Sequence, residues 1–393
     1  MSGAARTVPG PLRGLRVLDL THVLAGPYAT GQLALMGAEV IRLERPGGDD
    51  FVRRHGGTDE MRKAGLGASF LSQNAGKKSV VLDLKDPAGR DAALDLAARA
   101  DVVVENFRPG VLDRLGLGYD VLKSRRADTI LASLSGFGPE GPLSRRPAYD
   151  HILQGISGLM AMTGTAESGP LRVGLPIVDY VAGQVLVSAI LAGLLARAAD
   201  PGQAQHLQVS MLDAITGVMG AYAVHHQTTG QLRGLDGNRA FSDSPFSGRF
   251  DCAEGQIVVT ANSPAQARRL CAALGLSELA AATDAEAVGR ALAAAFAGAP
   301  AAEWEDRLAA AQVPAARVLN LAEALAHPQM ATSPCWHDLP VPQLGQTVRV
   351  PGLPFRAPWG PARDAPLPPA PVFDADTARE IAARTPASEG CPR

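Results

Sequence analysis

One carboxylate stands at the start of the most apolar stretch of the chain and is the first candidate for chemistry. From Tyr180 to Arg197 nearly every side chain is apolar, and Asp179 directly precedes this run. An aspartate here could cap a helix, its oxygen accepting hydrogen bonds from free backbone N–H groups. It could instead be a nucleophile beside those same N–H groups. The local sequence alone favours the cap.

The apolar run itself predicts a long helix. A helix that is apolar on all faces is expected to be buried. The run is about as long as a membrane span, but it lacks aromatic belts and lies within a mixed α/β pattern. We therefore predict a core helix and no membrane.

The chain before Asp179 alternates short apolar segments with helical ones. Strands are expected at residues 15–20, 39–44, 79–83, 101–105 and 129–134, with helices at 21–36, 90–100 and 111–117. This alternation predicts an α/β fold, with a Rossmann-like, doubly wound parallel sheet and right-handed crossovers.

Such a sheet binds ligands outside the carboxyl ends of its strands. Gly, Asn and Arg gather in the segments that follow those ends, at residues 21–26, 44–46, 106–110 and 135–138. Glycine permits close backbone approach, and arginine binds phosphate with two donors. We expect a nucleotide-like ligand with phosphates. The first strand is not followed by G-x-G-x-x-G, which disfavours a nicotinamide dehydrogenase.

The remainder of the chain predicts a second, smaller α+β domain. After a strand at 206–213 and a helix at 214–223, we expect a hairpin at 248–260, helices at 264–274, 286–296, 302–311 and 321–326, and a strand at 313–318. Residues 339–371 are rich in proline and are expected to be extended. The predicted division is a leader (1–13), a large Rossmann-like domain (14–225), a linker (226–247), a small domain (248–332) and a C-terminal segment (333–393) that returns to the large domain and ends in a frayed tail.

Composition excludes several classes of protein. The 393 residues, 46% apolar and 19% charged, suit a globular enzyme of two domains. A net charge of −2 does not suggest a nucleic-acid partner. Four scattered cysteines, with no C-x-x-C pair, predict a reducing cytoplasm, no disulfide framework and no zinc or other metal site. We see no signal peptide.

Several short motifs occur in a shared order between residues 11 and 355. They are Pro11–Asp19, Ala25–Pro27, Gly37–Ile41 with Glu44–Pro46, Val104–Gly110, Tyr149–Asp150 with Gln154–Gly155 and Gly158–Met160, and Val313–Pro314 with Val318. Each is weak alone, but their order is specific. The chain resembles the family III CoA-transferases (CaiB/BaiF-like), which include formyl-CoA transferase, carnitine CoA-transferase and α-methylacyl-CoA racemase.

The resemblance implies a CoA-transferase that acts on acyl-CoA and carboxylic acid substrates, has no tightly bound cofactor, and forms an interlaced homodimer. The family's catalytic aspartate falls on Asp179. Its CoA-contacting positions fall on His22, Leu24, Ala25, Arg45, Asn106, Phe107, Arg114 and Phe137.

The implied chemistry is covalent catalysis by Asp179. Its carboxylate would attack a thioester to give a mixed anhydride and CoA thiolate, which would then form an aspartyl-CoA thioester. An ordinary pKa near ~3.9 predicts that the carboxylate is ionised without a base. The site then needs a dry pocket and donors for the oxyanion. With the resemblance, the nucleophile outweighs the cap, and both roles could coexist.

Two departures from the family pattern leave questions open. Racemases carry a histidine directly before Asp150, where this chain has Tyr149. Transferase therefore outranks α-methylacyl-CoA racemase or epimerase, although Tyr149 or His151 could supply acid–base chemistry. The segment that matches a glycine-rich lid, residues 237–243, is not a glycine run. Two alternatives stay open: another segment shields the intermediate, or the acceptor is bulkier. A CoA-binding protein without turnover is the alternative from another class.

The acids exchanged are not evident from the sequence. Arg145, Arg146 and Arg172 flank the site region and hint at an anionic, dicarboxylic substrate. Arginines in loops are usually solvated, and the same alternative applies to Arg45 and Arg114.

Overall fold

The computed structural model describes residues 9–48, 50–239, 242–360 and 365–373. Most of the expected leader and of the expected tail lies outside the described residues. The chain forms two compact units. One comprises the chain up to Met160, Arg172–Leu232 and the chain from Ser333; the other comprises Ala161–Leu171 and Arg233–Thr332.

A six-stranded sheet forms the centre of the first unit. Its strands are β1 (Arg16–Asp19), β2 (Glu39–Glu44), β3 (Lys78–Val81), β4 (Val102–Glu105), β5 (Ile130–Ser135) and β8 (Gln205–Ser210). The order is β3-β2-β1-β4-β5-β8, and every neighbouring pair is parallel. The predicted α/β fold is confirmed. The winding direction reverses between β1 and β4, and a ligand crevice is expected outside their carboxyl ends.

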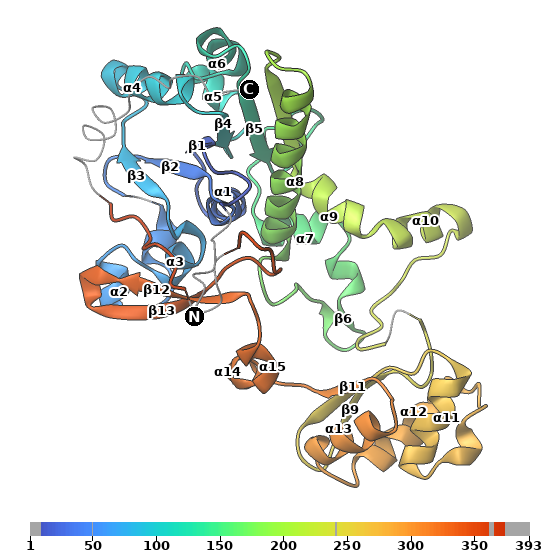
Figure 1. Cartoon of the computed structure of the whole chain (residues 1–393). Helices are drawn as coiled ribbons and strands as arrows, with labels where there is room; N and C mark the ends of the chain where they lie inside the picture. Colours follow the sequence, from blue (N-terminus) through green and yellow to red (C-terminus); the bar gives the residue numbers. More distant parts are fainter. Residues whose placement is uncertain (1–8, 49, 240–241, 361–364, 374–393) are drawn as a thin grey trace. The chain divides into compact units, whose positions relative to one another are not determined.

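Helices cover both faces of the sheet. The long helices α1 (Ala25–Leu35) and α8 (Ile177–Ala199) lie on one face, and α4 (Pro87–Ala98), α5 (Val111–Arg114) and α6 (Tyr119–Arg125) lie on the other (Figure 1). Successive strand residues alternate between the two cores. Val102 and Val104 pack on the α1 and α8 side, whereas Val103 packs on the side of α4 and α6.

The long apolar helix α8 differs from its prediction. One stripe is buried, including Val178, Leu186 and Ile190, but Val185 is 39% exposed and Leu195 is 73% exposed. The expectation of burial on all faces is wrong for the single chain, because the sheet and its neighbouring helices cover one side only. By length and composition α8 could cross a membrane, yet its buried stripe packs on the sheet core.

Helices α1 and α8 cross where α8 carries Gly183. A Cβ atom at this position would lie 2.7 Å from the carbonyl oxygen of Ala25, closer than side chains tolerate. The glycine therefore lets the backbone of α8 reach the first turn of α1. This contact places the N-terminal turn of α1 near the first turns of α8.

Two segments of the first unit were not predicted as regular elements. Helices α2 (Asp59–Lys63) and α3 (Ala68–Asn74) follow β2, and a hairpin of β12 (Trp336–Val341) and β13 (Gln346–Pro351) lies in the proline-rich segment. Phe70, Leu339 and Val350 share one buried cluster there. Farther along, the helix expected at 214–223 is two helices, α9 (Met211–Val218) and α10 (Gly220–Thr229), which meet at Met219.

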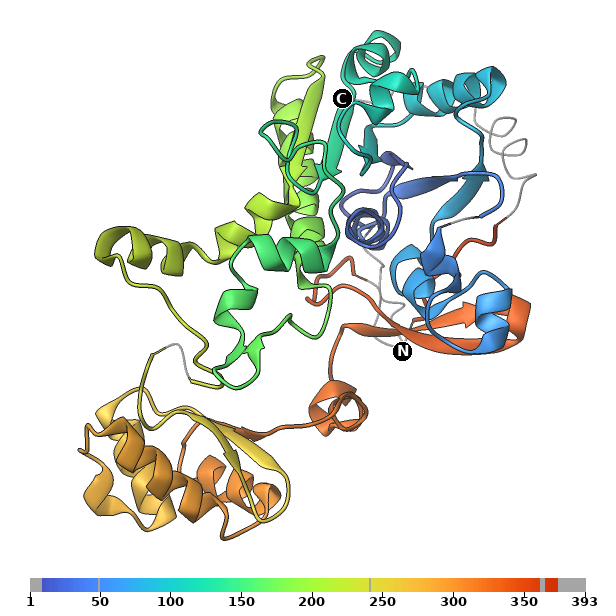
Figure 2. The same cartoon turned by 180° about the vertical axis from the view of Figure 1, so that it is seen from behind.

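The second unit is an α+β arrangement, as expected (Figure 2). Its antiparallel sheet has the order β11-β10-β9, from β9 (Gly248–Asp251), β10 (Gln256–Val259) and β11 (Ala315–Arg317). The helices are α11 (Pro264–Leu274), α12 (Ala285–Phe296), α13 (Ala301–Ala310), α14 (Leu321–Ala326) and α15 (Pro328–Ala331). Part of the segment that matches the family's lid, Ala240 and Phe241, lies outside the described residues.

Candidate active site

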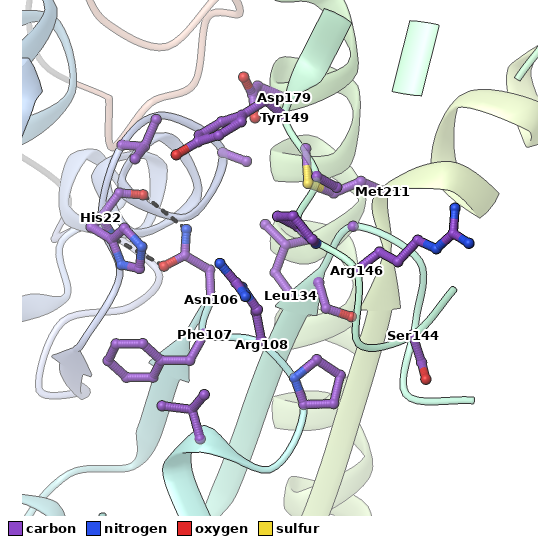
Figure 3. A pocket seen from close by; sticks show the side chains of 18 of the residues that line it. His22, Asn106, Phe107, Arg108, Leu134, Ser144, Arg146, Tyr149, Asp179 and Met211 are labelled. Atoms are coloured by element: carbon purple, nitrogen blue, oxygen red, sulfur yellow. Dashed lines mark hydrogen bonds between the residues drawn. The ribbon is translucent and has the colours of Figure 1, made fainter. Parts of the chain in front are cut away.

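Two adjoining cavities lie at the reversal point of the sheet. The first, of about 390 Å³, contains Asp179 (Figure 3). The second, of about 510 Å³, contains Arg45 and Lys85. Both are lined by the loop after β1 and by Phe107 after β4. The ligand crevice expected from the strand order is therefore present.

Most residues singled out from the sequence come together here. The first cavity is lined by Asp179 and by six of the expected CoA contacts: His22, Leu24, Ala25, Asn106, Phe107 and Arg114. Arg45 lines the second cavity, again with His22 and Phe107. Phe137 lines neither of these two cavities and packs against the core of the α1 and α8 side.

Asp179 is not the cap of its helix. Helix α8 begins at Ile177, so Asp179 is the third residue of its first turn. The N-cap residue is Pro176, whose side chain accepts no hydrogen bond. The carboxylate of Asp150 performs this role from another helix. Its Oδ2 accepts from the backbone N–H of Val178 at 2.7 Å and of Asp179 at 3.4 Å. The capping interpretation of Asp179 is wrong.

Asp150 is itself fixed by a neighbouring amide. It begins helix α7 (Asp150–Ile156), and one turn later Gln154 donates from Nε2 to Asp150 Oδ1 at 2.6 Å. The Oε1 of Gln154 accepts from the backbone N–H of Val173 at 2.8 Å. Gln154 thus ties α7 to the segment that leads into α8. Among the described residues, none donates a hydrogen bond to the Asp179 carboxylate.

The surroundings of Asp179 change its acidity. Burial raises the pKa of its carboxyl to about 7, and the negative charge of Asp150 contributes in the same direction. This differs from the ordinary carboxylate expected from the sequence. Near neutral pH, roughly half of the molecules carry an ionised Asp179.

The loop after β1 is fixed to the loop after β4 by Asn106. Its Oδ1 accepts from the backbone N–H of His22 at 3.0 Å, and its Nδ2 donates to the His22 carbonyl at 2.8 Å (Figure 3). The rings of His22 and Phe107 lie 5.6 Å apart. The pKa of His22 is lowered, chiefly because protein atoms displace water from the ring. Asn106 therefore joins the two strand ends that border the crevice.

The family model for CoA-transferase family III matches residues 12–377. The chain belongs to CoA-transferase family III. This confirms the resemblance inferred from the ordered motifs.

This family III CoA-transferase has named relatives. It is 37% identical to acetyl-CoA:oxalate CoA-transferase of Acetobacter aceti over 82% of this chain and 84% of that protein. It is 36% identical to succinate–glutarate CoA-transferase of Agrobacterium fabrum, over 69% of this chain and 68% of that protein. The crystal structure of a CaiB/BaiF family protein from Brucella suis superimposes with a TM-score of 0.82 at 29% identity, covering 96% of this chain and 100% of that one.

Three arginines line the first cavity of this CoA-transferase: Arg108, Arg114 and Arg146. Among the described residues, no carboxylate lies within ion-pair distance of any of the three. Unpaired guanidinium groups at a cavity wall suit phosphate or carboxylate ligands. Of these, Arg108 lies in the 106–110 segment expected at a strand end, but it was not included among the expected CoA contacts. Arg145 and Arg172 do not line either cavity.

Tyr149 and His151, the residues that bear on the racemase alternative, differ in position. Tyr149 lines both cavities of the transferase, and Figure 3 shows it with Asp179 at the same end of the first one. His151 lines neither cavity. Within the described part of the chain, no group of three or more His, Cys, Asp and Glu side chains is arranged to bind a metal ion.

Proposed function

We propose that this enzyme transfers CoA between two carboxylic acids through covalent intermediates on Asp179. One observation carries the proposal. The Asp179 carboxylate borders the first cavity and accepts no hydrogen bond from the described residues. The backbone N–H groups of its helical turn are bonded to Asp150 instead. A carboxylate that serves no structural contact is available to react with a ligand.

The proposed reaction has four substitution steps. Asp179 attacks the thioester carbonyl of the donor, the C–S bond breaks, and a mixed anhydride and CoA thiolate form. The thiolate attacks the aspartyl carbonyl, which releases the donor acid and leaves an aspartyl-CoA thioester. The acceptor carboxylate attacks this thioester and releases the thiolate again. The thiolate then attacks the acceptor carbonyl, which gives the new acyl-CoA and restores the Asp179 carboxylate.

The first turn of α1 is the best source of oxyanion donors. Its N-cap residue Leu24 provides no side-chain cap, and Leu24 and Ala25 line the cavity that contains Asp179. The corresponding N–H groups of α8 are bonded to Asp150. We infer that N–H groups of α1 stabilise the developing negative charge.

The two adjoining cavities together offer volume and positively charged side chains for an acyl-CoA. We place its nucleotide end in the second cavity, where Arg45 and Lys85 would neutralise phosphates. The pantetheine would pass His22, Asn106 and Phe107 toward Asp179, with Arg114 beside it. Phe137, which packs in the core on the α1 and α8 side, would support the cavity wall without contacting the ligand.

The relatives are named for oxalate, succinate and glutarate, which are dicarboxylates. We propose dicarboxylic substrates here as well, with Arg108 or Arg146 facing the second carboxylate. Transfer rates for a panel of mono- and dicarboxylic acids test this, since a preference for monocarboxylates would contradict it.

Trapping the intermediate tests the mechanism. After incubation with acyl-CoA donor, we expect mass spectrometry to find CoA attached to the peptide that contains Asp179, and hydroxylamine to remove it. Exchange of α-hydrogen for deuterium from the solvent, without transfer, would support the racemase alternative instead.

The raised pKa of Asp179 predicts an acid limb in the rate profile. Only the ionised carboxylate is a nucleophile, so kcat/KM should rise about tenfold per pH unit below pH ~7 and level off above it. Asp150→Asn removes one of the two causes of the raised pKa and keeps an oxygen for the α8 cap. Its acid limb should move to lower pH. A limb that stays in place would show that Asp150 does not tune Asp179.

We propose further that a second copy of the chain covers the exposed side of α8. Val185 and Leu195 on α8, Val218 at the end of α9 and Val224 on α10 are exposed apolar side chains of three successive helices. We expect light scattering to give the mass of a dimer and Leu195→Asp to lower the dimer fraction. A monomeric wild type at micromolar concentration would contradict this proposal.

A further inference from the structure

The wall shared by the two cavities contains an unusual backbone conformation. Val23 has φ of 69° and lines both cavities. Positive φ is a genuine outlier for a β-branched residue, because its side chain crowds the backbone in the left-handed region. Among the described residues, only Asp243 and Gln312 share this feature without being glycine. Such a conformation persists only where neighbouring groups fix it.

The group that contacts Val23 itself is the carboxylate of Asp50. Its Oδ2 accepts a hydrogen bond from the backbone N–H of Val23 at 3.2 Å. Asn106 holds the other end of the same peptide group, because its Nδ2 donates to the carbonyl of His22 at 2.8 Å. The peptide that enters Val23 is therefore fixed at its N–H by Asp50 and at its carbonyl by Asn106.

Asp50 is in turn held by a buried arginine of the central sheet. Arg42 on β2 is 1% exposed, and its Nη2 donates to Asp50 Oδ2 at 2.5 Å. The other carboxylate oxygen accepts from the backbone N–H of Val52 at 3.3 Å. One carboxylate thus connects the sheet, the segment after β2 and the loop that borders the cavities.

We propose that Asp50 is a positioning residue, which fixes Val23 in the left-handed conformation and so sets the cavity wall for the CoA ligand. The identity of the ligand rests on the proposed function; the effect on Val23 does not. Without Asp50, the N–H of Val23 loses its acceptor and only the carbonyl end of that peptide is still held, so Val23 relaxes toward negative φ and its side chain leaves its place between the cavities. Ligand binding must then restore the strained conformation, which lowers affinity.

The test is a pair of affinity measurements in two backgrounds. Calorimetry with CoA should show that Asp50→Ala raises Kd by about tenfold or more, as expected for loss of a hydrogen bond to a charged group. In the Val23→Gly background, the same Asp50→Ala change should raise Kd much less, because glycine adopts positive φ without cost. If Asp50→Ala folds poorly, Asp50→Asn replaces it in the test. This variant keeps an oxygen acceptor, so it should raise Kd less than Asp50→Ala.

Val111→Gly is the matched control. Val111 lines the same two cavities and has negative φ. Shortening it removes the same side chain from the walls without relieving strain, so it should not reduce the effect of Asp50→Ala. Equal losses in the wild-type and Val23→Gly backgrounds, or equal relief by Val111→Gly, would overturn the proposal.

A crystal structure of Asp50→Ala separates this inference from the proposed function. We expect negative φ at Val23 in that variant, and a φ that stays positive would overturn the proposal whatever the ligand. Failure of the wild type to bind CoA would contradict the proposed function and leave the backbone result decisive for Asp50.

Discussion

Replacing Asp179 by asparagine is expected to lower kcat/KM for CoA transfer on the order of 10⁴-fold or more, as removal of a nucleophile does in other enzymes. The amide has nearly the shape of the carboxylate but cannot form the anhydride. Because the CoA cavities are otherwise unchanged, Kd for CoA should remain close to the wild-type value. Chromatography of the CoA esters measures the rate, and calorimetry measures the affinity.

The same variant should not lose stability. The pKa of Asp179 is raised from its ordinary value of 3.8 to about 7 in the folded state. Folding therefore favours the protonated form, and stability is lost as the pH rises from the unfolded pKa to the folded one. At pH 8, Asp179→Asn should unfold at the same urea concentration as the wild type or a higher one. Asparagine also caps helices, so the cap is tested by Asp179→Ala, which would cost about 1 kcal/mol if Asp179 were a cap.

Asp200→Asn at the other end of α8 is the matched control. Asp200 is exposed and follows the last residue of the helix, so the same chemical change there should leave both rate and stability unchanged. Normal transfer by Asp179→Asn would refute the covalent mechanism. Loss of CoA binding together with activity would indicate a damaged cavity instead of a missing nucleophile.

Elements with strong local signals were predictable from the sequence. Strand β2 and helices α11 and α14 have the predicted limits. Both helices begin with capping boxes, formed by Ser263 with Gln266 and by Asn320 with Glu323. Each capping box joins two residues that are three positions apart, so the local sequence is enough to fix the helix start.

Elements that depend on distant partners were not predictable. Prolines at 340, 342 and 351 conceal the β12–β13 hairpin, whose buried residues Leu339 and Val350 pack with Phe70 of α3. The prediction for helix α8 was wrong in the opposite direction, because burial was expected on all faces and one face is exposed. An exposed apolar helix face has the same composition as a buried one, so the sequence alone cannot separate them.

The site shows the same limit. The positions of His22 and Asn106 at one cavity follow from the order of strands, since parallel strands bring their carboxyl ends to one edge, whereas Asp179 lies in the first turn of α8. The capping of α8 by Asp150 joins residues 28 or 29 positions apart, and no local pattern reveals it. The raised pKa of Asp179 and the positive φ of Val23 likewise depend on residues that are distant in the sequence, Asp150 and Asp50 respectively.

Lys77→Met is expected to destabilise the first unit by about 3–5 kcal/mol, the cost of leaving a buried charge without its partner. Lys77 and Asp19 are both completely buried, and their side chains form an ion pair at 3.0 Å. The ammonium also donates to the carbonyl of Pro27 at 2.9 Å and to Thr30 Oγ1 at 2.8 Å, both in α1. Burial lowers the pKa of Lys77 to about 8, although Asp19 opposes this shift.

The adjacent residue provides the control for Lys77→Met. Lys78 forms an ion pair with Glu39, but its side chain is 53% exposed. Water replaces this interaction readily, so Lys78→Met should cost less than about 1 kcal/mol. Urea unfolding followed by circular dichroism measures both. Equal midpoints for the two variants would contradict the assigned weight of the buried pair.

A double-mutant cycle shows whether the loss comes from the pair. Asp19→Asn removes the charge that Lys77 neutralises, so the double variant Asp19→Asn/Lys77→Met should lose less than the sum of the single losses. Additive losses would mean that Lys77 acts through Pro27 and Thr30 alone. Because Asp19 also accepts from the N–H of Thr21, at 2.9 Å, the pair fixes the residue from which the His22–Leu24 loop departs. Variants of this buried pair should therefore raise Kd for CoA as well, which links the stability of the sheet edge to the geometry of the crevice.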